Sequence, residues 1–464
     1  MHMCRSNTFL LDIVRIGHPQ VSRTFQERLG TLLIQAFAQQ QHMAGNSSQW
    51  SGVGPNFQQR GGVQEGHHRW WPLNKEGERF VRLRRSNDEY RYWLYAANPP
   101  PSKHERFTIV SYNILAVDNA RAHWRELYYH IPSHVMQWNT RKRKLLQELG
   151  LWSPDIICLQ EVDRYDDLNK RLQDMGFTGV YKGRTGMATD GCAIFWRPAR
   201  FQLLHEENIE FRELDLRDNV AQLCVLQMKN RNTKASEDEG ATQASKSGST
   251  KGGKNCVVVA NIHVLFNPKR GDVKLGQVRV LLEKAHSLSQ EWGGAPVVIA
   301  GDFNSTPLSA VYHYISTSEL DVSQLDRKQL SGQDDNDNCY TRPAQQLPTS
   351  QVNRVCCWSP EELKAATGSE QQTVVRHDLL LQSSYAQIEG KAGSRDDMGE
   401  PLVTTYHRKF MGTVDYIWHT DGLFVVRVLD TLPVDVLERS HGLPSQKWGS
   451  DHLALACELA FVSG

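Results

Sequence analysis

Residues 296–304 read PVVIAGDFN, and this short stretch decides the fold. A brief apolar run that ends at a glycine is typical of a buried strand. A buried strand has little use for a charge at its end unless other groups meet the charge there, because an isolated charge is costly to remove from water. The stretch therefore predicts a central strand of a sheet, followed by two functional side chains, Asp302 and Asn304.

Further along the chain in both directions, polar residues again stand where apolar runs begin or end. Because ligands of α/β sheets gather at strand ends, we expect these side chains to converge on one site. Each residue alone has an ordinary structural explanation, such as a turn or a strand cap, but the ordered set does not. The set consists of Asn113 after FTIVSY, Glu161 after DIICLQ, His263 after VVVANI, Asp415 at the start of DYIW, and Asp451 and His452 before LALACEL.

Strand-like and helix-like segments alternate from residue 106 onward. Residues 141–149 (RKRKLLQEL) are expected to form a helix that Thr140 caps and Gly150 ends, and residues 272–291 form another. Interleaved strands and helices predict the α/β class with mixed sheets.

The chain divides into two regions by composition. Residues 1–105 are predicted to be a largely disordered extension with one amphipathic helix at residues 25–39, because a tract rich in Gln, Gly and Ser buries too little apolar area to fold. An excess of arginine near the start leaves a transit peptide open as an alternative. Residues 106–464 are predicted to be the folded domain. Polar inserts at 230–255 and 332–372 are predicted to be solvated loops within it.

Composition excludes several classes of protein. The 464 residues carry 53 Lys and Arg against 52 Asp and Glu, a net charge of +1, so nucleic acid could bind only through a local basic groove. No run approaches the length of a membrane span, and we expect no membrane partner. Nine cysteines without a C-x-x-C pair argue against a disulfide framework and a zinc ribbon.

The strand-end residues suit one chemistry. They comprise four carboxylates, two carboxamides and two imidazoles, with no thiolate. Hard oxygen ligands of this kind favour Mg²⁺ or Mn²⁺ over zinc. The pattern therefore predicts metal-assisted hydrolysis of a phosphoester.

Taken in order, six motifs resemble those of the exonuclease–endonuclease–phosphatase superfamily: SYNIL, LQEV, NIHV, GDFNSTP, VDYIW and SDHLAL. Within it, NPKRGDVKLGQV at residues 267–278 and the Phe410-x-Gly412 pair are similar to the carbon-catabolite-repressor-type deadenylases, with nocturnin and Angel as relatives. The resemblance covers about residues 106–462 outside the inserts. It implies a DNase I-like four-layer α/β/β/α sandwich and magnesium-dependent 3′-5′ removal of poly(A) from mRNA.

The resemblance also implies a role for each residue. Glu161 is the main metal ligand and Asn113 supports it. Asp302 and Asn304 bind or orient the attacking water with a second ion, and the division of Asp302 between base and ligand stays open. Both ions are Mg²⁺, with Mn²⁺ as an alternative. The remaining roles are phosphate contact by His263, phosphate or metal binding by His452, orientation of that histidine by Asp415, and an outer supporting role for Asp451.

Substrate contacts are predicted outside the catalytic set. Phe410 and Pro268 are expected to sandwich the terminal base, since stacking is the main way of holding single-stranded bases. Lys182 and Arg184 are expected to line a phosphate track. Residues 141–144 (RKRK) are expected to be a solvated charged face instead.

The sequence leaves other functions open. The same catalytic set serves a nucleotide 2′-phosphatase or an endonuclease, and an inactive RNA-binding adaptor would be a different class. The expected partner is single-stranded RNA or a poly(A) tail. Residues 1–105 contain no leucine-rich repeat, which makes docking into the NOT-type deadenylase complex doubtful. We expect a location in nucleus and cytoplasm, with mitochondria as the minor alternative.

Overall fold

The computed structural model describes residues 90–101, 103–229, 255–333 and 358–462. The predicted helix at residues 25–39 and most of both polar inserts lie outside these ranges. Within the described part of the chain, no helix is both long and apolar enough to cross a membrane.

One of the two main sheets has seven strands and is built mostly from the two ends of the folded region. Its central strands β2 and β3 run parallel, and the other neighbours in the sheet run antiparallel. In spatial order the strands are β1 (Trp93–Tyr95), β16 (Leu423–Leu429), β17 (Leu455–Phe461), β2 (Arg106–Asn113), β3 (Ile156–Gln160), β5 (Gly191–Trp196) and β4 (Thr178–Gly183).

The second main sheet has six strands, and its one parallel pair is β8 with β9. Strand β9 contains the apolar run that ends at Gly301 and Asp302, and it lies in the interior of the sheet as predicted. In spatial order the strands are β12 (Leu381–Ser383), β15 (Asp415–Thr420), β9 (Val297–Asp302), β8 (Cys256–His263), β7 (Val220–Met228) and β6 (Phe201–Glu210).

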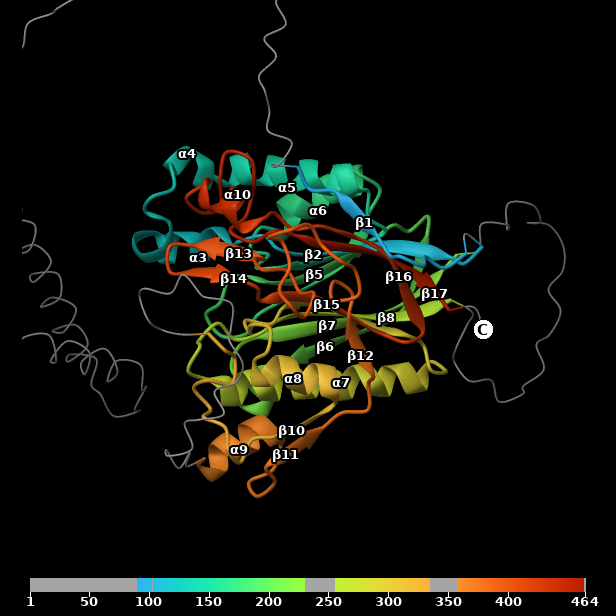
Figure 1. Cartoon of the computed structure of the whole chain (residues 1–464), viewed down its shortest axis with the longest axis vertical. Coiled ribbons are helices and arrows are strands. Elements are labelled where there is room, and N and C mark those ends of the chain that lie inside the picture. The colour runs from blue at the N-terminus through green and yellow to red at the C-terminus, as the bar shows by residue number, and fades with distance from the viewer. Residues whose placement is uncertain (1–89, 102, 230–254, 334–357, 463–464) are drawn as a thin grey trace, which may run out of the picture. The chain divides into compact units, whose positions relative to one another are not determined.

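The two sheets lie face to face with helices outside both, so the predicted four-layer sandwich is confirmed (Figure 1). Helices α5 and α6 cover the seven-stranded sheet, and α7 and α8 cover the six-stranded one. The helices are α3 (Val117–Ala122), η2 (Trp124–Tyr128), α4 (Ser133–Met136), α5 (Trp138–Trp152), α6 (Tyr165–Asp174), η3 (Phe211–Leu214), α7 (Gly271–Glu291), α8 (Ala310–Thr317), α9 (Pro360–Thr367) and α10 (Val434–Glu438). Two small two-stranded sheets complete the described elements: β10 (Glu319–Asp321) with β11 (Val374–Arg376), and the hairpin of β13 (Thr405–His407) with β14 (Phe410–Gly412).

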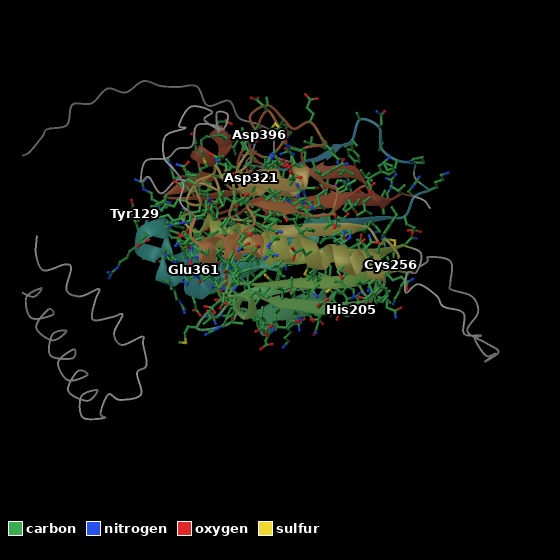
Figure 2. The ribbon with its side chains drawn as sticks, turned by 90° about the horizontal axis from the view of Figure 1, so that it is seen from below. Tyr129, His205, Cys256, Asp321, Glu361 and Asp396 are labelled. Carbon is green, nitrogen blue, oxygen red and sulfur yellow. The ribbon has the colours of Figure 1, made fainter. Side chains whose placement is uncertain are left out.

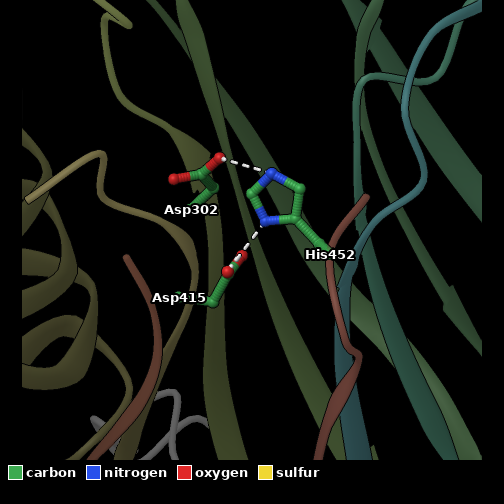
Figure 3. Close-up of side chains that lie close together, drawn as sticks. All are labelled: Asp302, Asp415 and His452. Carbon is green, nitrogen blue, oxygen red and sulfur yellow. Dashed lines mark hydrogen bonds and ion pairs between the residues drawn. The ribbon is translucent and has the colours of Figure 1, made fainter. Parts of the chain in front are cut away.

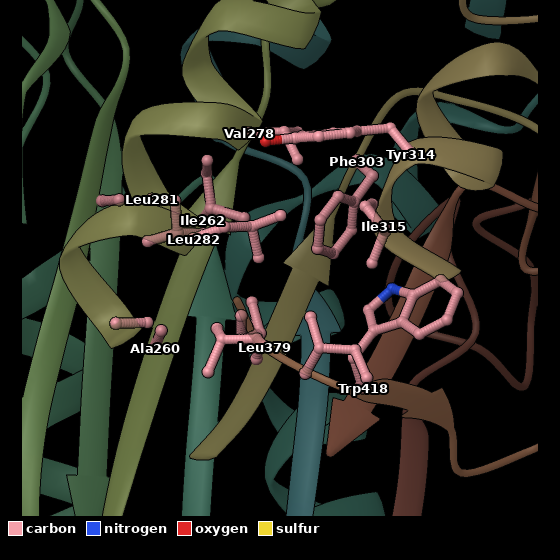
Figure 4. Packing of buried hydrophobic residues seen from close by; sticks show 14 of the residues in the cluster. Ala260, Ile262, Val278, Leu281, Leu282, Phe303, Tyr314, Ile315, Leu379 and Trp418 are labelled. Carbon is pink, nitrogen blue, oxygen red and sulfur yellow. The ribbon is translucent and has the colours of Figure 1, made fainter. Parts of the chain in front are cut away.

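Apolar side chains fill the spaces between the layers. Between the sheets, alternate residues of β2, β3 and β5 meet those of β7, β8 and β9 in one buried cluster. Between the six-stranded sheet and its helices, Ile262, Phe303 and Trp418 pack with Leu281 and Leu282 (Figure 4). These cores fix the strands relative to one another, and so fix the side chains at the strand ends.

The polar strand ends gather at one end of this sandwich. Cys256 starts β8 and lies at the opposite end from Tyr129, which follows η2 (Figure 2). Strand β8 therefore runs toward η2 and brings His263 to that end of the molecule.

The structure moves several predicted boundaries. Strand β1 pairs with β16, so the folded region begins before residue 106, inside the segment predicted to be disordered. Helix α9 lies inside the predicted loop 332–372, and a Ser359–Glu362 capping box starts it. Helix α5 begins at Trp138 and continues through Gly150 to Trp152, so Thr140 is not its cap.

Candidate active site

The sheet register places three of the predicted residues side by side. His263 is the partner of Asp302 in the parallel β8–β9 pair, and Asp415 is the partner of Asp302 in the antiparallel β9–β15 pair. Because partners in adjacent strands lie about 5 Å apart, three residues far apart in sequence form one cluster. The sequence predicted that these groups converge, and the register shows how.

A cavity of about 200 Å³ lies at this end of the sheets. Asn113 and Asp415, which do not line it, are buried directly behind residues that do. The predicted residues that line the cavity are Glu161, His263, Asp302, Asn304, Asp451, His452, Arg184 and Phe410.

Glu161 follows β3 in a left-handed backbone conformation, with φ of 57°. Such a conformation is uncommon for a residue with a side chain, and it aims the carboxylate at the start of α3. There its oxygens accept N–H groups from Ala116 and Asn119, each at 2.9 Å, and from Asn113 at 3.1 Å. Burial acts to raise the pKa of Glu161, but the charge of His263 and these donors outweigh burial and lower the pKa to about 2. Glu161 is therefore a permanent anion.

Asn113 connects the two principal carboxylates. Its Nδ2 donates to Glu161 Oε1 and also to Asp302 Oδ2, at 3.0 Å, while its Oδ1 accepts the Leu115 N–H. With all of its bonds internal, Asn113 holds Glu161 and Asp302 at a fixed separation.

The turn after β9 holds the predicted pair Asp302 and Asn304. Asp302 Oδ1 accepts the backbone N–H of Asn304 at 2.9 Å, and the Asn304 amide donates to Val264 O. Asn304 adopts a left-handed conformation with φ of 46°. The buried amino group of Lys274, whose pKa burial lowers to about 7, donates to Asn304 O at 2.5 Å and to Gln333 at 2.7 Å. Lys274 thus fixes a strained turn that carries two site residues.

His452 lies between Asp415 and Asp302 (Figure 3). Its Nδ1 lies 2.8 Å from Asp415 Oδ2, and its Nε2 lies 3.8 Å from Asp302 Oδ2. Thr404 donates a further hydrogen bond to Asp415 at 2.6 Å. Burial opposes the charge on His452, but Asp415 and Asp451 raise its pKa well above 6.5. Burial raises the pKa of Asp415 to about 6. Near pH 7 the pair is therefore an imidazolium bound to a carboxylate.

Asp451 holds segments around the site together and does not face Asp302. Tyr128 donates to its Oδ2 at 2.6 Å, and the neighbouring Ser450 donates to Asn113 O at 2.7 Å. These bonds tie η2 to the segment before β17. Burial raises the pKa of the Asp451 carboxyl.

Arg141 corrects the prediction of a solvated charged face at residues 141–144. Its side chain is fully buried, and its guanidinium donates to Ile114 O, Leu115 O and Gly449 O. It fastens the segment after β2 to the segment before His452. Arg141, which was predicted to be solvated, therefore supports the site from behind.

Of the four predicted substrate residues, two line the cavity and two do not. Phe410 and Arg184 line the cavity, and Arg184 is held by Asp190 through bonds of 3.0 and 2.5 Å. Lys182 instead pairs with Glu210, and neither it nor Pro268 lines the cavity. The structure does not support those two residues as substrate contacts at the cavity.

Several residues that line the cavity were missed in the sequence. Phe266 lies two residues before Pro268 and its side chain is 53% exposed, so it can offer the stacking face expected of the proline. Only Asn119 could have been noticed, as a second asparagine closely following SYN. The missed lining residues are Leu115, Asn119, His123, Leu127, Tyr128, Asn219, Phe266, Gln333, Thr405, His407 and Val414.

The donor set fits a hard divalent cation. Glu161 is ionised and partly open to the cavity, and Asn113 holds Asp302 beside it. Asp302, Asp415 and His452 also bring one atom each within 4.8 Å of one another. Because His452 is bound to Asp415 and charged, we assign it to phosphate rather than to the cation. Glu161 and Asp302 would hold the ion.

The sequence is similar to a known protein family and to known plant proteins. Residues 110–452 match the profile of the Endonuclease/Exonuclease/phosphatase family. The chain is 50% identical over 386 residues to Carbon catabolite repressor protein 4 homolog 5 of Arabidopsis thaliana, covering 82% of each protein. It is 47% identical over 379 residues to homolog 3 from the same plant, covering 80% of this chain and 79% of that protein.

A solved structure is also similar. The crystal structure of ANGEL2, described as a 2′,3′-cyclic phosphatase and bound to adenosine-2′,3′-vanadate, superposes with a TM-score of 0.63 at 30% identity. The match covers 80% of this chain and 99% of that one.

Proposed function

Since the chain belongs to the endonuclease/exonuclease/phosphatase family, we propose that it is a magnesium-dependent 3′-5′ exoribonuclease that shortens the poly(A) ends of mRNA. The carbon catabolite repressor protein 4 homologues at 50% and 47% identity support a deadenylase-type phosphoesterase. The chemistry is hydrolysis of a phosphodiester. What we propose beyond this is that the substrate is poly(A).

One observation carries this choice. The cavity that holds Glu161, Asp302 and His452 is also lined by two phenylalanines, Phe410 and Phe266. Phosphate chemistry needs no aromatic ring, whereas a single-stranded base stacks on one. A site with both parts suits a nucleotide at the end of a flexible strand.

The side chains have distinct roles in the proposed reaction. His452 uses Nδ1–H to bind Asp415, which leaves Nε2–H to donate to an oxygen of the scissile phosphate. Asp302 Oδ2 faces the same space and can take the proton of an attacking water. His263 Nε2 lies 3.6 Å from Asp302 and can contact a phosphate oxygen. Bound at Glu161 and Asp302, Mg²⁺ would supply charge neutralisation for the phosphate.

The cellular context follows from the substrate. We propose single-stranded poly(A) RNA as the partner and nucleus and cytoplasm as the location, where poly(A) is found. Import of a full-length fluorescent fusion into mitochondria, lost on removal of residues 1–40, would overturn this location. Stable binding to the NOT-type complex is not part of the proposal, and recovery of that complex with the tagged chain would revise it.

A second candidate is a 2′,3′-cyclic phosphatase acting on RNA ends. The similarity to ANGEL2 favours it, since that protein is described with this activity. Both reactions attack a phosphorus atom beside a ribose. They differ in whether the chain is shortened.

Two RNAs of the same sequence separate the candidates. Both are 5′-labelled and end in a run of adenosines, one with a free 3′-hydroxyl and one with a 2′,3′-cyclic phosphate. With Mg²⁺, the proposed function predicts stepwise shortening of the first RNA. Loss of the cyclic end group without shortening of either RNA would favour the second candidate. Glu161→Gln is the control for a contaminating nuclease.

A further inference from the structure

The β13–β14 hairpin forms one wall of the cavity beside the catalytic histidine. Thr405 forms a bridge with His452, and two residues further along β13 His407 is the partner of Phe410. Residues two apart in a strand face the same side, about 7 Å apart. Thr405 and His407 both line the cavity. The wall thus leads from the phosphate-binding His452 to the ring of Phe410.

His407 is placed to act as an uncharged donor. Its Nδ1 accepts the backbone N–H of Lys409 at 3.3 Å, so its proton resides on Nε2. Among the described residues, Nε2 has no hydrogen-bond partner. Burial, together with the nearby His452 and His123, lowers the pKa of His407 to about 3. Its Nε2–H can therefore serve a ligand without adding charge to the site.

We propose that His407 is a specificity residue that donates Nε2–H to the ribose 2′-oxygen of the nucleotide whose base stacks on Phe410. The proposal rests on the proposed function. The ring centroids of His407 and Phe410 are 6.2 Å apart, so His407 lies beside the base position and on the side toward His452. In a nucleotide the group between base and phosphate is the ribose. A neutral donor suits an uncharged hydroxyl, and the 2′-hydroxyl is the group that distinguishes RNA from DNA.

The test compares two RNA oligomers that differ in one atom. Both end in a run of adenosines, and in one the last nucleotide is 2′-deoxyadenosine. The measured quantity is kcat/KM for release of the last nucleotide. We expect the wild-type protein to prefer the all-ribose oligomer about tenfold, the value of one good hydrogen bond. His407→Leu should reduce this ratio to about one through a loss on the ribose substrate alone. His407→Gln, which keeps a donor, should retain part of it.

Controls separate specificity from folding. His134→Gln changes an exposed histidine outside the cavity lining and should leave the ratio unchanged. An unchanged ratio in His407→Leu, or equal losses on both oligomers and on bis(p-nitrophenyl) phosphate, would overturn the proposal. A change in preference for the base without a change in the ratio would also overturn it, because His407 would then read the base.

The outcomes for the wild-type protein distinguish this proposal from the proposed function. Trimming of both oligomers at equal rates would overturn the ribose proposal and leave the exoribonuclease standing. Hydrolysis of bis(p-nitrophenyl) phosphate without trimming of either oligomer would remove the exoribonuclease, and the ribose proposal with it.

Discussion

Two glutamates in different layers of the molecule show what makes a carboxylate functional. Glu161 stands at the end of β3 and accepts three N–H groups, and its pKa is lowered to about 2. Glu148 lies on α5, accepts only the Tyr112 hydroxyl at 2.9 Å, and leaves Oε1 without a partner among the described residues. Burial raises the pKa of Glu148 to about 7.

The difference teaches that the neighbouring groups, namely His263 and the converging N–H donors, keep Glu161 ionised against the effect of burial. Both groups lie inside the fold, although Glu161 is partly open to the cavity, and only the one that faces His263 and converging N–H groups stays charged across the physiological range. Asn113 and Asn119, as hydrogen-bond donors to Glu161, help to keep it ionised. The cavity end of the sheets is a preformed site for a cation, and the α5 layer is not.

The largest effect should come from removing the anion. Glu161→Gln keeps the size and some hydrogen bonds but removes the charge, and we expect kcat/KM for poly(A) trimming to fall about a thousandfold or more. Glu148→Gln is the matched control and should keep nearly full activity. Comparable losses in the two variants would break the comparison.

The effect of Glu148 should instead appear in the pH dependence of the free energy of unfolding. Because its pKa is raised from 4.5 to about 7, its contribution to stability is full below pH 4.5 and is lost as the pH rises through 7. The loss amounts to about 3 kcal/mol. Denaturant unfolding between pH 4.5 and 8 should therefore show a steeper decline for the wild-type protein than for Glu148→Gln. Parallel curves would contradict the assigned shift.

A third prediction concerns the ion pair at the site. Asp415→Asn removes the charge that raises the pKa of His452, so His452 should lose its proton at lower pH. The alkaline limb of the pH–rate profile should move toward neutrality, and kcat should fall about a hundredfold. In the wild-type protein, activity should also fall as the pH drops below about 6, where Asp415 becomes protonated. An alkaline limb unchanged in the variant would show that His452 does not govern it.

The smallest effect is expected at Lys274. Lys274→Met leaves Asn304 O and the Gln333 side chain without their donor, so the turn that carries Asp302 and Asn304 should loosen. We expect kcat/KM to fall about tenfold. The exposed Lys328→Met is the control. Loss of thermal stability without loss of rate would assign Lys274 to the fold alone.

The sequence was informative where local pattern sets position. A short apolar run followed by an acid predicted β9 and its Asp302. The interleaving of strands and helices predicted the α/β class, and the four-layer sandwich came from the resemblance of the motifs to the superfamily. Glu161 was recognisable for the same reason as Asp302. Glu148 was not, since RKRKLLQEL resembles an ordinary surface helix and its partner Tyr112 lies 36 residues away.

Long-range contacts explain the errors. Arg141 looked solvated because its carbonyl partners come from Ile114, Leu115 and Gly449, which no local pattern connects with it. Phe266 rather than Pro268 lines the cavity because the path of the loop after β8 depends on packing. Helix α9 was hidden in a polar stretch, where Trp358 anchors its start by donating to Leu325 O.

The most direct test of the central claim is the metal dependence of RNA shortening. A 5′-labelled RNA ending in adenosines is incubated with the protein in Mg²⁺, and in parallel with excess chelator. The account predicts a ladder of shortened products with Mg²⁺, none with chelator, and recovery when Mg²⁺ is restored. Full shortening in excess chelator, or in the Glu161→Gln variant, would contradict it.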